Sequence, residues 1–451
     1  MADNYTFSPH ETLGARGRTR ASFVTTQHPR YTWEPESWEQ TVRMIKPNGT
    51  ARYTACFDKA RKKKVKSVIH HWNEQLTPND FADITGVYTA SGLSAAYSIN
   101  TSTDTRRADG EILYVKMTAA DAKKFTNDFL VRLQDHTYGT NYVYGVTGTP
   151  VINGASSYVP VTLVQADNNY PTSAFAADDA DTLYIISPVM EEGDLPPKAI
   201  HYEHESLWNC TQIVRTSLRM TRTAMQTGLR TAYDVAMAKR ECLLRHQARK
   251  EKALLFGFRD ADNTGPDGYP ARLTGGLDYF ISTNRFDWKV DKGDAWKTSG
   301  WSWLRSIAES MLDYKGADGG NGNRRTVLCG QGVWNSMSTL LHTSDEGAVR
   351  YNTTPMTDTF GGTCQRFEHA GMIFDFTVHP QLTYHPFFKY SAFFLEDSCI
   401  KQFYLQDDFY KKKVGDNGFD GQWSEFIWEG GFQIEGERLM AVAHNFGAPG
   451  L

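Results

Sequence analysis

A long stretch without proline constrains this fold more than any other feature of the sequence. It runs from Thr221 to Gly257, and its only internal glycine is Gly228. Proline and glycine are the residues that most disfavour a helix interior, so the stretch predicts a single helix over 221–257. At ~1.5 Å per residue this helix would be about 54 Å long, whereas an average soluble helix has about eleven residues.

The apolar residues of this stretch are too sparse for a coiled coil or a fully buried helix. Those that follow helical spacings are Met225, Leu229, Ala232, Ala236, Leu243 and Leu254. Arg240 and Lys250 interrupt their line, whereas a dimeric coiled coil needs sustained apolar a and d positions and a buried helix needs apolar residues on all sides. We therefore predict a helix along a surface, with one packed flank and one basic flank facing solvent, a neighbouring chain or nucleic acid.

The rest of the sequence contains strand-like and helix-like segments in a defined order. Short strand-like runs between Gly, Asn, Asp and Ser clusters fill residues 80–200. After the long helix we expect a second helix at 301–316, a buried strand at 324–330 and a third helix at 331–344. Further on, one strand would place four apolar residues on a single face, namely Met372, Phe374, Phe376 and Val378. This order predicts an α+β fold.

Length, charge and cysteine usage bound the class of protein. The 451 residues suit about three domains or one large domain, and 13% aromatic residues indicate high β content or extensive protein–protein contact. A net charge of −4 limits polyanion binding to a local patch. The six cysteines are dispersed without a CxxC pair, which fits a reducing compartment. The N-terminus lacks a secretory apolar region and no membrane-length apolar run occurs, so we expect cytoplasmic synthesis and no membrane partner.

The common motifs for catalysis, metals and cofactors are absent from the sequence. No HExxH, P-loop, GxSxG or GxGxxG pattern occurs, so we expect no enzyme activity, no metal and no cofactor. In "HYEHE" at 201–205 a strand would turn the second histidine away from the other ionisable groups, which disfavours a metal site. A β-rich hydrolase with a noncontiguous Ser, His and Asp site stays an alternative, because such triads are defined by geometry rather than by spacing.

A basic run is the candidate for contact with a charged partner. It places six positive charges within eight residues, namely Lys59, Arg61, Lys62, Lys63, Lys64 and Lys66. Charge density alone suffices to bind nucleic-acid phosphate, and base stacking is not expected because no aromatic residue interrupts the run. The alternative, which we favour, is a solvated loop or an ion-pair partner for acidic residues of another subunit.

The segment that leads into the long stretch resembles a known family. "NCTQI" from Asn209, followed by a Thr-rich step, is similar to the SU10-like group of tailed-bacteriophage major capsid proteins, which have the HK97 fold. Further marks follow in the same order: "RKEKALLFG", "RLTGGL", "TVLCG", "FDFTVHPQL", "FLEDSCIKQFYLQ" and "SEFIWEGGFQIEGERLMAVAHNF". The resemblance covers about 200–447 and rests on the order and spacing of these pieces.

The resemblance implies an HK97-like domain plan. Its parts would be an N-terminal arm at 1–30, an extended β-loop region with peripheral-domain strands and an inserted β-subdomain at 31–200, a peripheral domain at 201–274 with its spine helix at 221–257, an axial domain at 275–370, and return strands of both domains at 371–451. The span before the helix exceeds what an arm and a plain β-loop need, so the inserted β-subdomain is expected within about 80–200.

The same resemblance implies a function. The chain would be a major capsid protein that self-assembles through hexamers and pentamers into the icosahedral shell of a virion, inside the cytoplasm of a bacterial host. Its partners would be further copies of itself, a separate scaffolding protein, a portal, non-specifically held double-stranded DNA and, as an option, a decoration protein. The alternatives are a cytoplasmic nucleic-acid-binding protein that uses the 59–66 run, and the hydrolase named above.

Overall fold

The chain folds into two compact units, and one is inserted into the other. The computed structural model describes residues 62–448 apart from gaps at 78, 98–106, 136–141, 168–179, 191, 194–202, 228–234, 293–294, 313, 315–322, 344–355, 358–362, 370 and 415–419. The expected arm at 1–30 and two members of the basic run, Lys59 and Arg61, lie outside the described residues. The second unit, Asn73–Leu207, is inserted between Trp72 and Trp208 of the first.

The inserted unit is built on a seven-stranded antiparallel sheet in the order β3-β9-β6-β7-β8-β5-β4. Its elements are β3 (Phe81–Asp83), β4 (Gly86–Tyr88), β5 (Ile112–Lys116), α2 (Ala119–Ala122), β6 (Phe129–Gln134), β7 (Tyr142–Thr147), the 3-10 turn η2 (Gly154–Ser156), β8 (Tyr158–Leu163) and β9 (Thr182–Pro188). Along β7 and β8 buried residues alternate with partly exposed ones, so one face of the sheet forms the core. The unit confirms the inserted β-subdomain expected within about 80–200.

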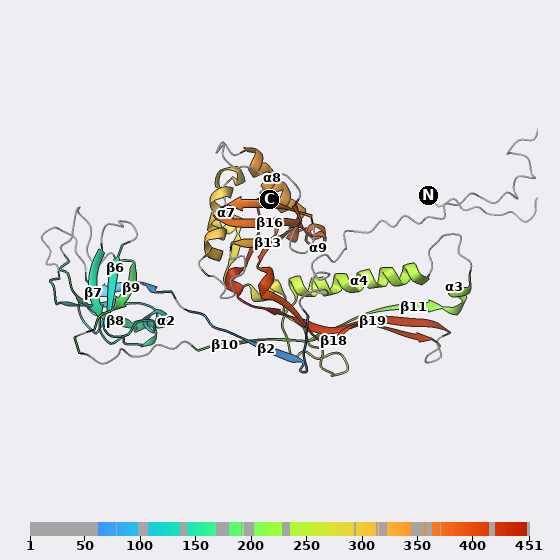
Figure 1. The fold of residues 1–451 in the computed structure, drawn as a ribbon, viewed down its shortest axis with the longest axis horizontal. Helices are drawn as coiled ribbons and strands as arrows, with labels where there is room; N and C mark the ends of the chain where they lie inside the picture. Colours follow the sequence, from blue (N-terminus) through green and yellow to red (C-terminus); the bar gives the residue numbers. More distant parts are fainter. Residues whose placement is uncertain are drawn as a thin grey trace, which may run out of the picture. The chain divides into compact units, whose positions relative to one another are not determined.

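A four-stranded sheet and the longest described helix form one part of the first unit. The sheet has the order β1-β18-β19-β11, with β1 parallel to β18 and the other pairs antiparallel. Its strands are β1 (Lys62–Lys64), β18 (Ile400–Val414), β19 (Gly421–Ile434) and β11 (Gln212–Thr221). Figure 1 shows α4 (Val235–Phe256) running alongside β11 and β19, which it contacts. A separate two-stranded sheet pairs β2 (Ile69–Glu74) with β10 (Glu205–Cys210).

The expectation of one helix over 221–257 is wrong. β11 continues to Thr221, and the short helix α3 (Arg222–Gln226) ends at Thr227, whose backbone is extended with φ −71° and ψ 122°. The next described helix, α4, begins at Val235. The residues between them, 228–234, lie outside the described residues.

Hydrogen bonds made by threonine side chains account for this break, which the absence of proline did not predict. Thr221 accepts a hydrogen bond from the Ala224 N–H at 3.2 Å and so caps α3, and Thr227 donates through Oγ1 to the Thr223 carbonyl at 2.7 Å. Threonine is β-branched, and its hydroxyl competes for backbone groups, so it favours caps and strands over helix interiors. The absence of proline therefore did not secure a continuous helix.

The other part of the first unit is a seven-stranded mixed sheet with helices packed on it. The sheet has the order β12-β20-β17-β13-β16-β15-β14. Its strands are β12 (Arg285–Asp287), β13 (Arg324–Cys329), β14 (Met356–Thr357), β15 (Thr363–His369), β16 (Met372–Val378), β17 (Ala392–Leu395) and β20 (Ala441–His444). The helices are α5 (Leu277–Phe280), α6 (Trp288–Asp291), α7 (Trp296–Leu312), α8 (Gln331–Thr343) and α9 (Pro380–Tyr384), with 3-10 turns η4 (Phe388–Tyr390), η5 (Asp397–Cys399) and η6 (Glu437–Leu439).

The sequence predicted several of these elements correctly. α7 and α8 are the expected second and third helices, and β13 is the expected buried strand. In β16 the residues Met372, Phe374 and Phe376 are buried in the core, and Val378 packs partly buried against it. The core is aromatic: the ring of Trp303 lies 5.5 Å from that of Trp288 and 5.3 Å from that of Phe446.

Candidate functional site

Asn209 at the end of β10 holds three segments together. Its side chain is fully buried, and Oδ1 accepts hydrogen bonds from the N–H groups of Cys210 and Gly275, each at 2.9 Å. Nδ2 donates to the carbonyls of Gly275 at 3.0 Å and Phe432 at 2.7 Å. Both lone pairs and both amide hydrogens are therefore used, so no other side chain of this size can replace asparagine without leaving a buried backbone group unpaired.

Glycines bring the backbones at this point into direct contact. The Gly276 N–H donates to the Gly257 carbonyl at 2.9 Å. A Cβ added to Gly276 would lie 2.5 Å from the Leu254 carbonyl oxygen, and one added to Gly257 would overlap the carbonyls of Ala253 and Thr274. We call Asn209, Gly257, Gly275, Gly276 and Gly431 the glycine junction.

The glycine junction also receives β19. A Cβ on Gly431 would lie 2.7 Å from the Cys210 carbonyl oxygen and 2.9 Å from Thr274 Oγ1. The Thr274 N–H in turn donates to Gln212 Oε1 at 3.3 Å. Four of the segments that carried the sequence resemblance, "NCTQI", "LLFG", "TGG" and "EGGF", thus meet in one place. Each supplies a residue whose small size or paired amide the contact requires.

The face of α4 toward the sheet carries a buried ion pair. Lys250 Nζ donates to Asp408 Oδ2 at 2.7 Å, and only 1% of the Lys250 side chain is exposed. His246 Nε2 lies 3.2 Å from Asp408 Oδ1, and its Nδ1 lies 3.3 Å from Thr216 Oγ1. Burial alone would raise the pKa of Asp408, but hydrogen bonds from His246 and Lys250 and the lysine charge outweigh it and hold the pKa at about 2.

An irregularity in β18 gives two adjacent carboxylates different partners. The register of β18 against β19 shifts between Gln406 and Phe409. Asp407 accepts from Lys62 Nζ of β1 at 2.8 Å, whereas Asp408 contacts α4. A regular strand would also alternate neighbouring side chains, but the extra residues of a bulge re-aim them locally. Asp407 and Asp408 thus connect β18 to β1 and to α4, respectively.

A second buried pair links α4 to α9. Glu251 and His379 are both fully buried, and His379 Nε2 forms a short hydrogen bond with Glu251 Oε1. His379 Nδ1 accepts the Gln381 N–H at 3.3 Å as the cap of α9. Because Nδ1 is an acceptor there, the ring proton sits on Nε2 and is donated to Glu251. Gln381 Nε2 also donates to the Ala248 carbonyl at 3.4 Å.

The apolar line expected along this helix is therefore only partly right. Leu254 is buried as expected, but Ala236 is exposed, and Lys250, expected to interrupt the packed flank, lies within it. The buried residues of α4 are Ala238, Cys242, His246, Lys250, Glu251, Leu254 and Leu255. Sequence reasoning missed the polar members because charged residues are almost never fully buried unless they are paired. Ala238, Cys242, His246 and Lys250 follow one another at intervals of four residues, and this spacing was the sequence signal that His246 and Lys250 lie on the buried face.

One lysine of the basic run forms an ion pair within its own chain. Lys62 is ion-paired with Asp407, with 18% of the lysine side chain exposed. Lys63, Lys64 and Lys66 are exposed, and Val65 between them is buried. Within the described part of the run, Lys62–Lys64 form a strand against β18 rather than a loop, and Lys63, Lys64 and Lys66 lie on the surface. The expected ion pairing with acidic residues of another subunit stays a prediction.

Among the described residues, Ser391, His444 at the end of β20 and Asp278 form one grouping of the three residue types of a hydrolase triad. Ser391 Oγ is 3.0 Å from His444 Nδ1, but His444 Nε2 is 4.0 Å from Asp278. Arg285 bonds Asp278 at 2.9 Å and also reaches His444 Nε2 at 3.3 Å. Ser391 is fully buried, and burial also lowers the pKa of His444. In a catalytic triad the serine is accessible and the histidine is hydrogen-bonded to a carboxylate, so this grouping does not have triad geometry.

The described residues lack both a metal-ligating cluster and a helix of membrane-spanning character. They contain no group of three or more His, Cys, Asp or Glu side chains that could hold a metal ion. None of their helices combines the length and apolar character needed to cross a membrane. The four described cysteines with placed side chains, Cys210, Cys242, Cys329 and Cys399, are free thiols.

Comparison with known protein families gives an extensive match. A family model described as SU10 major capsid protein matches residues 19–447. No curated protein matches the chain.

Solved structures with low similarity include several capsids. "Microbacterium phage Oxtober96" is 9% identical, with coverage of 94% of this chain and 99% of that chain and a TM-score of 0.42. "Capsid of native GTA particle computed with C5 symmetry" is 8% identical, with coverage of 94% and 99% and a TM-score of 0.40. "The capsid of Myoviridae Phage XM1" is 10% identical, with coverage of 56% and 81% and a TM-score of 0.36. Scores this low leave the family match as the result that bears on function.

Proposed function

The chain belongs to the SU10 major capsid protein family, and from this premise we propose that its copies form the hexamers and pentamers of an icosahedral shell around double-stranded DNA. As a major capsid protein of a tailed bacteriophage it self-associates and resides in the virion. The match to the family over residues 19–447 is the observation that carries the proposal. We assign the protein no catalytic step, because the family is structural.

The described elements suggest how the parts of an HK97-like subunit are distributed. We assign α4 and the β1-β18-β19-β11 sheet to the peripheral domain, with α4 as its shortened spine helix. The seven-stranded sheet with α7 and α8 is assigned to the axial domain. β2 and β10 form the base of the extended β-loop, and the inserted unit interrupts that loop between them.

This assignment gives the glycine junction a mechanical role. Asn209 at the end of β10 bonds β19 and the segment after α4. A force applied to the proposed β-loop would be transmitted to the peripheral domain through these hydrogen bonds of the buried Asn209 side chain. The backbones are in direct contact here, and the Asn209 amide is fully hydrogen-bonded. Such a closely packed region transmits strain because protein interiors deform little. The proposed loop could then bind a neighbour without bending at its base.

Three exposed lysines are the proposed contact with packaged DNA. Lys63, Lys64 and Lys66 have surface positions, whereas Lys62 is engaged with Asp407. Such contacts need no sequence readout, because phosphate charge alone provides the attraction. A separate scaffolding protein, a portal and an optional decoration protein complete the proposed partner set, and assembly takes place in the cytoplasm of the bacterial host.

Assembly tests this proposal directly. The full-length chain is expressed in bacteria with and without a scaffolding protein from the same phage, and the purified material is viewed by negative-stain electron microscopy. Closed shells or their hexameric and pentameric pieces are expected. Persistent monomers under both conditions would contradict the proposed function, whatever nucleic acid or substrate those monomers bind.

A further inference from the structure

Charge is distributed very unevenly between the two units. The inserted unit Asn73–Leu207 contains 18 Asp and Glu but only 7 Lys and Arg, a formal net charge of −11. The remainder contains 34 acidic and 41 basic residues, a net charge of +7, which together with the insert gives the −4 of the whole chain. Within that remainder residues 1–72 account for the whole excess, with 13 basic and 6 acidic residues.

Three positive side chains of the insert are engaged within the insert. Lys124 is paired with Asp121 at 2.7 Å and Arg107 with Glu111 at 3.2 Å. The Arg132 guanidinium lies 4.0 Å from the centre of the Tyr142 ring and is thus directed onto an aromatic side chain of its own sheet.

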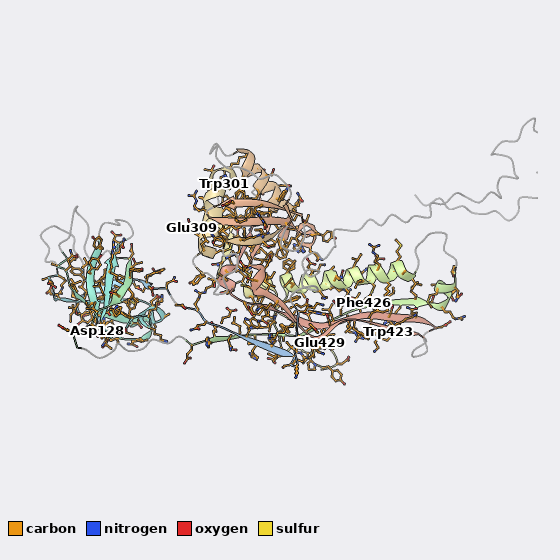
Figure 2. The ribbon with its side chains drawn as sticks, in the orientation of Figure 1. Asp128, Trp301, Glu309, Trp423, Phe426 and Glu429 are labelled. Atoms are coloured by element: carbon orange, nitrogen blue, oxygen red, sulfur yellow. The ribbon has the colours of Figure 1, made fainter. Side chains whose placement is uncertain are left out.

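Several acids in the described part of the insert, by contrast, have no ion-pair partner there. Exposed acidic residues without an ion pair among the described residues of the unit include Asp80, Asp83, Asp128 and Glu192. Asp128, labelled in Figure 2, directly precedes β6, and Asp83 ends β3. The carboxylates therefore project from several parts of the sheet rather than forming one compensated cluster. The unit presents net negative charge on more than one side.

From this distribution we propose that the inserted β-unit lies on the outer surface of the shell, out of contact with the packaged DNA. Duplex DNA carries one negative charge per ~1.7 Å of its axis, and salt screens charges only beyond ~8 Å at physiological ionic strength. An acidic unit packed against DNA at shorter range would meet largely unscreened repulsion. The exterior is the position in which its carboxylates keep their hydration and counterions. The inference rests on the proposed shell function.

Cysteine labelling of intact particles tests this placement. Ala155→Cys in η2 and Ser91→Cys, in the turn after β4, replace exposed residues of the insert. Lys66→Cys places a matched thiol on the exposed side of the basic run. DNA-filled particles of each variant are treated with a polyethylene-glycol maleimide too large to pass through a shell, then compared with the same particles after dissociation. The unsubstituted particle gives the background from natural cysteines.

We expect the two insert cysteines to react as fully in intact particles as after dissociation. Lys66→Cys is expected to react only after dissociation, at least tenfold less in the intact particle. Protection of both insert positions in filled particles would overturn the exterior placement, and would instead put the unit against DNA or inside a contact between copies. Failure to obtain any particles is a distinct result, because it would remove the proposed shell function and this inference with it.

Discussion

Lys250 of α4 and Asp408 of β18 lie 2.7 Å apart with the lysine almost completely buried, so the helix is fastened to the sheet by a charge pair rather than by apolar contact alone. His246, one helical turn earlier, bonds the other oxygen of the same carboxylate. Breaking such a pair from one side leaves an uncompensated charge inside the protein. The helix and the bulge of β18 therefore depend on each other.

Removing the carboxylate should be costly. Asp408→Ala is expected to lower the free energy of unfolding by about 3–5 kcal/mol, because the charge of Lys250 would stay buried after losing this carboxylate. Urea unfolding of the purified full-length subunit measures the change. Asp407→Ala is the matched control, since Asp407 is 40% exposed and its pair with Lys62 should contribute no more than about 1 kcal/mol. Equal losses for the two variants would contradict the buried-pair account.

The same pair predicts an acid limit for stability. The pKa of Asp408 falls from 3.8 in its reference state to about 2 in the fold. A depressed pKa means that the folded state binds the proton less readily than the unfolded state, so the stabilisation is complete above about pH 4 and is lost as the pH falls toward 2. Melting temperatures measured across this range should fall more steeply in the natural protein than in Asp408→Asn. Parallel curves would show that other carboxyl groups control the transition.

The glycine junction should reject even one methyl group. In Gly276→Ala the new Cβ would press on the carbonyl oxygens of Leu254 and Ala253, which are backbone atoms and cannot rotate away. We expect a loss of about 1–3 kcal/mol or more, read as a lower melting temperature and fewer assembled particles. Gly92→Ala is the control, because its Cβ would meet nothing within 4 Å and should leave stability unchanged or slightly raised. An unaffected Gly276→Ala would disprove the close contact.

The exposed lysines should govern how DNA retention depends on salt. Combined replacement of Lys63, Lys64 and Lys66 by Ala should make filled particles release DNA at lower salt, with the logarithmic salt slope reduced by up to about 3 if each lysine meets one phosphate. Free subunits should bind DNA weakly with or without the change. Lys123→Ala, an exposed lysine of the acidic insert, serves as the control. A changed particle yield with an unchanged salt slope would instead assign the lysines to a neighbouring subunit.

The sequence predicted those parts of the fold in which apolar pattern and tertiary environment agree. The alternation in β16 and the periodicity of α7 each marked a face that the structure buries. It failed from Thr221 to Thr227, where threonine side chains compete for backbone groups and the neighbouring strand β19 holds β11 extended as far as Thr221. The absence of proline carries no information about the threonine hydrogen bonds or about the pairing of β11 with β19.

The polar contacts of α4 were beyond sequence reasoning for a different reason. Lys250 reads as a solvent-facing residue unless Asp408 is known to lie beside it, and the two are 158 positions apart. Glu251 and His379 are likewise distant in sequence and become a pair only when α9 packs against α4. The glycine junction was visible only as motifs, because the sequence gives the order of "NCTQI" and "TGG" but not the distance between them.

The insertion of Asn73–Leu207 between two paired strands has an evolutionary consequence. β2 and β10 belong to one two-stranded sheet, so the chain leaves for the insert and returns from it through neighbouring strands. A segment that begins and ends at adjoining backbone positions can be exchanged for a short hairpin turn, or for an unrelated domain, without rethreading the remaining chain. The position between β2 and β10 is therefore a site at which related phages can replace the inserted domain while keeping the rest of the capsid subunit.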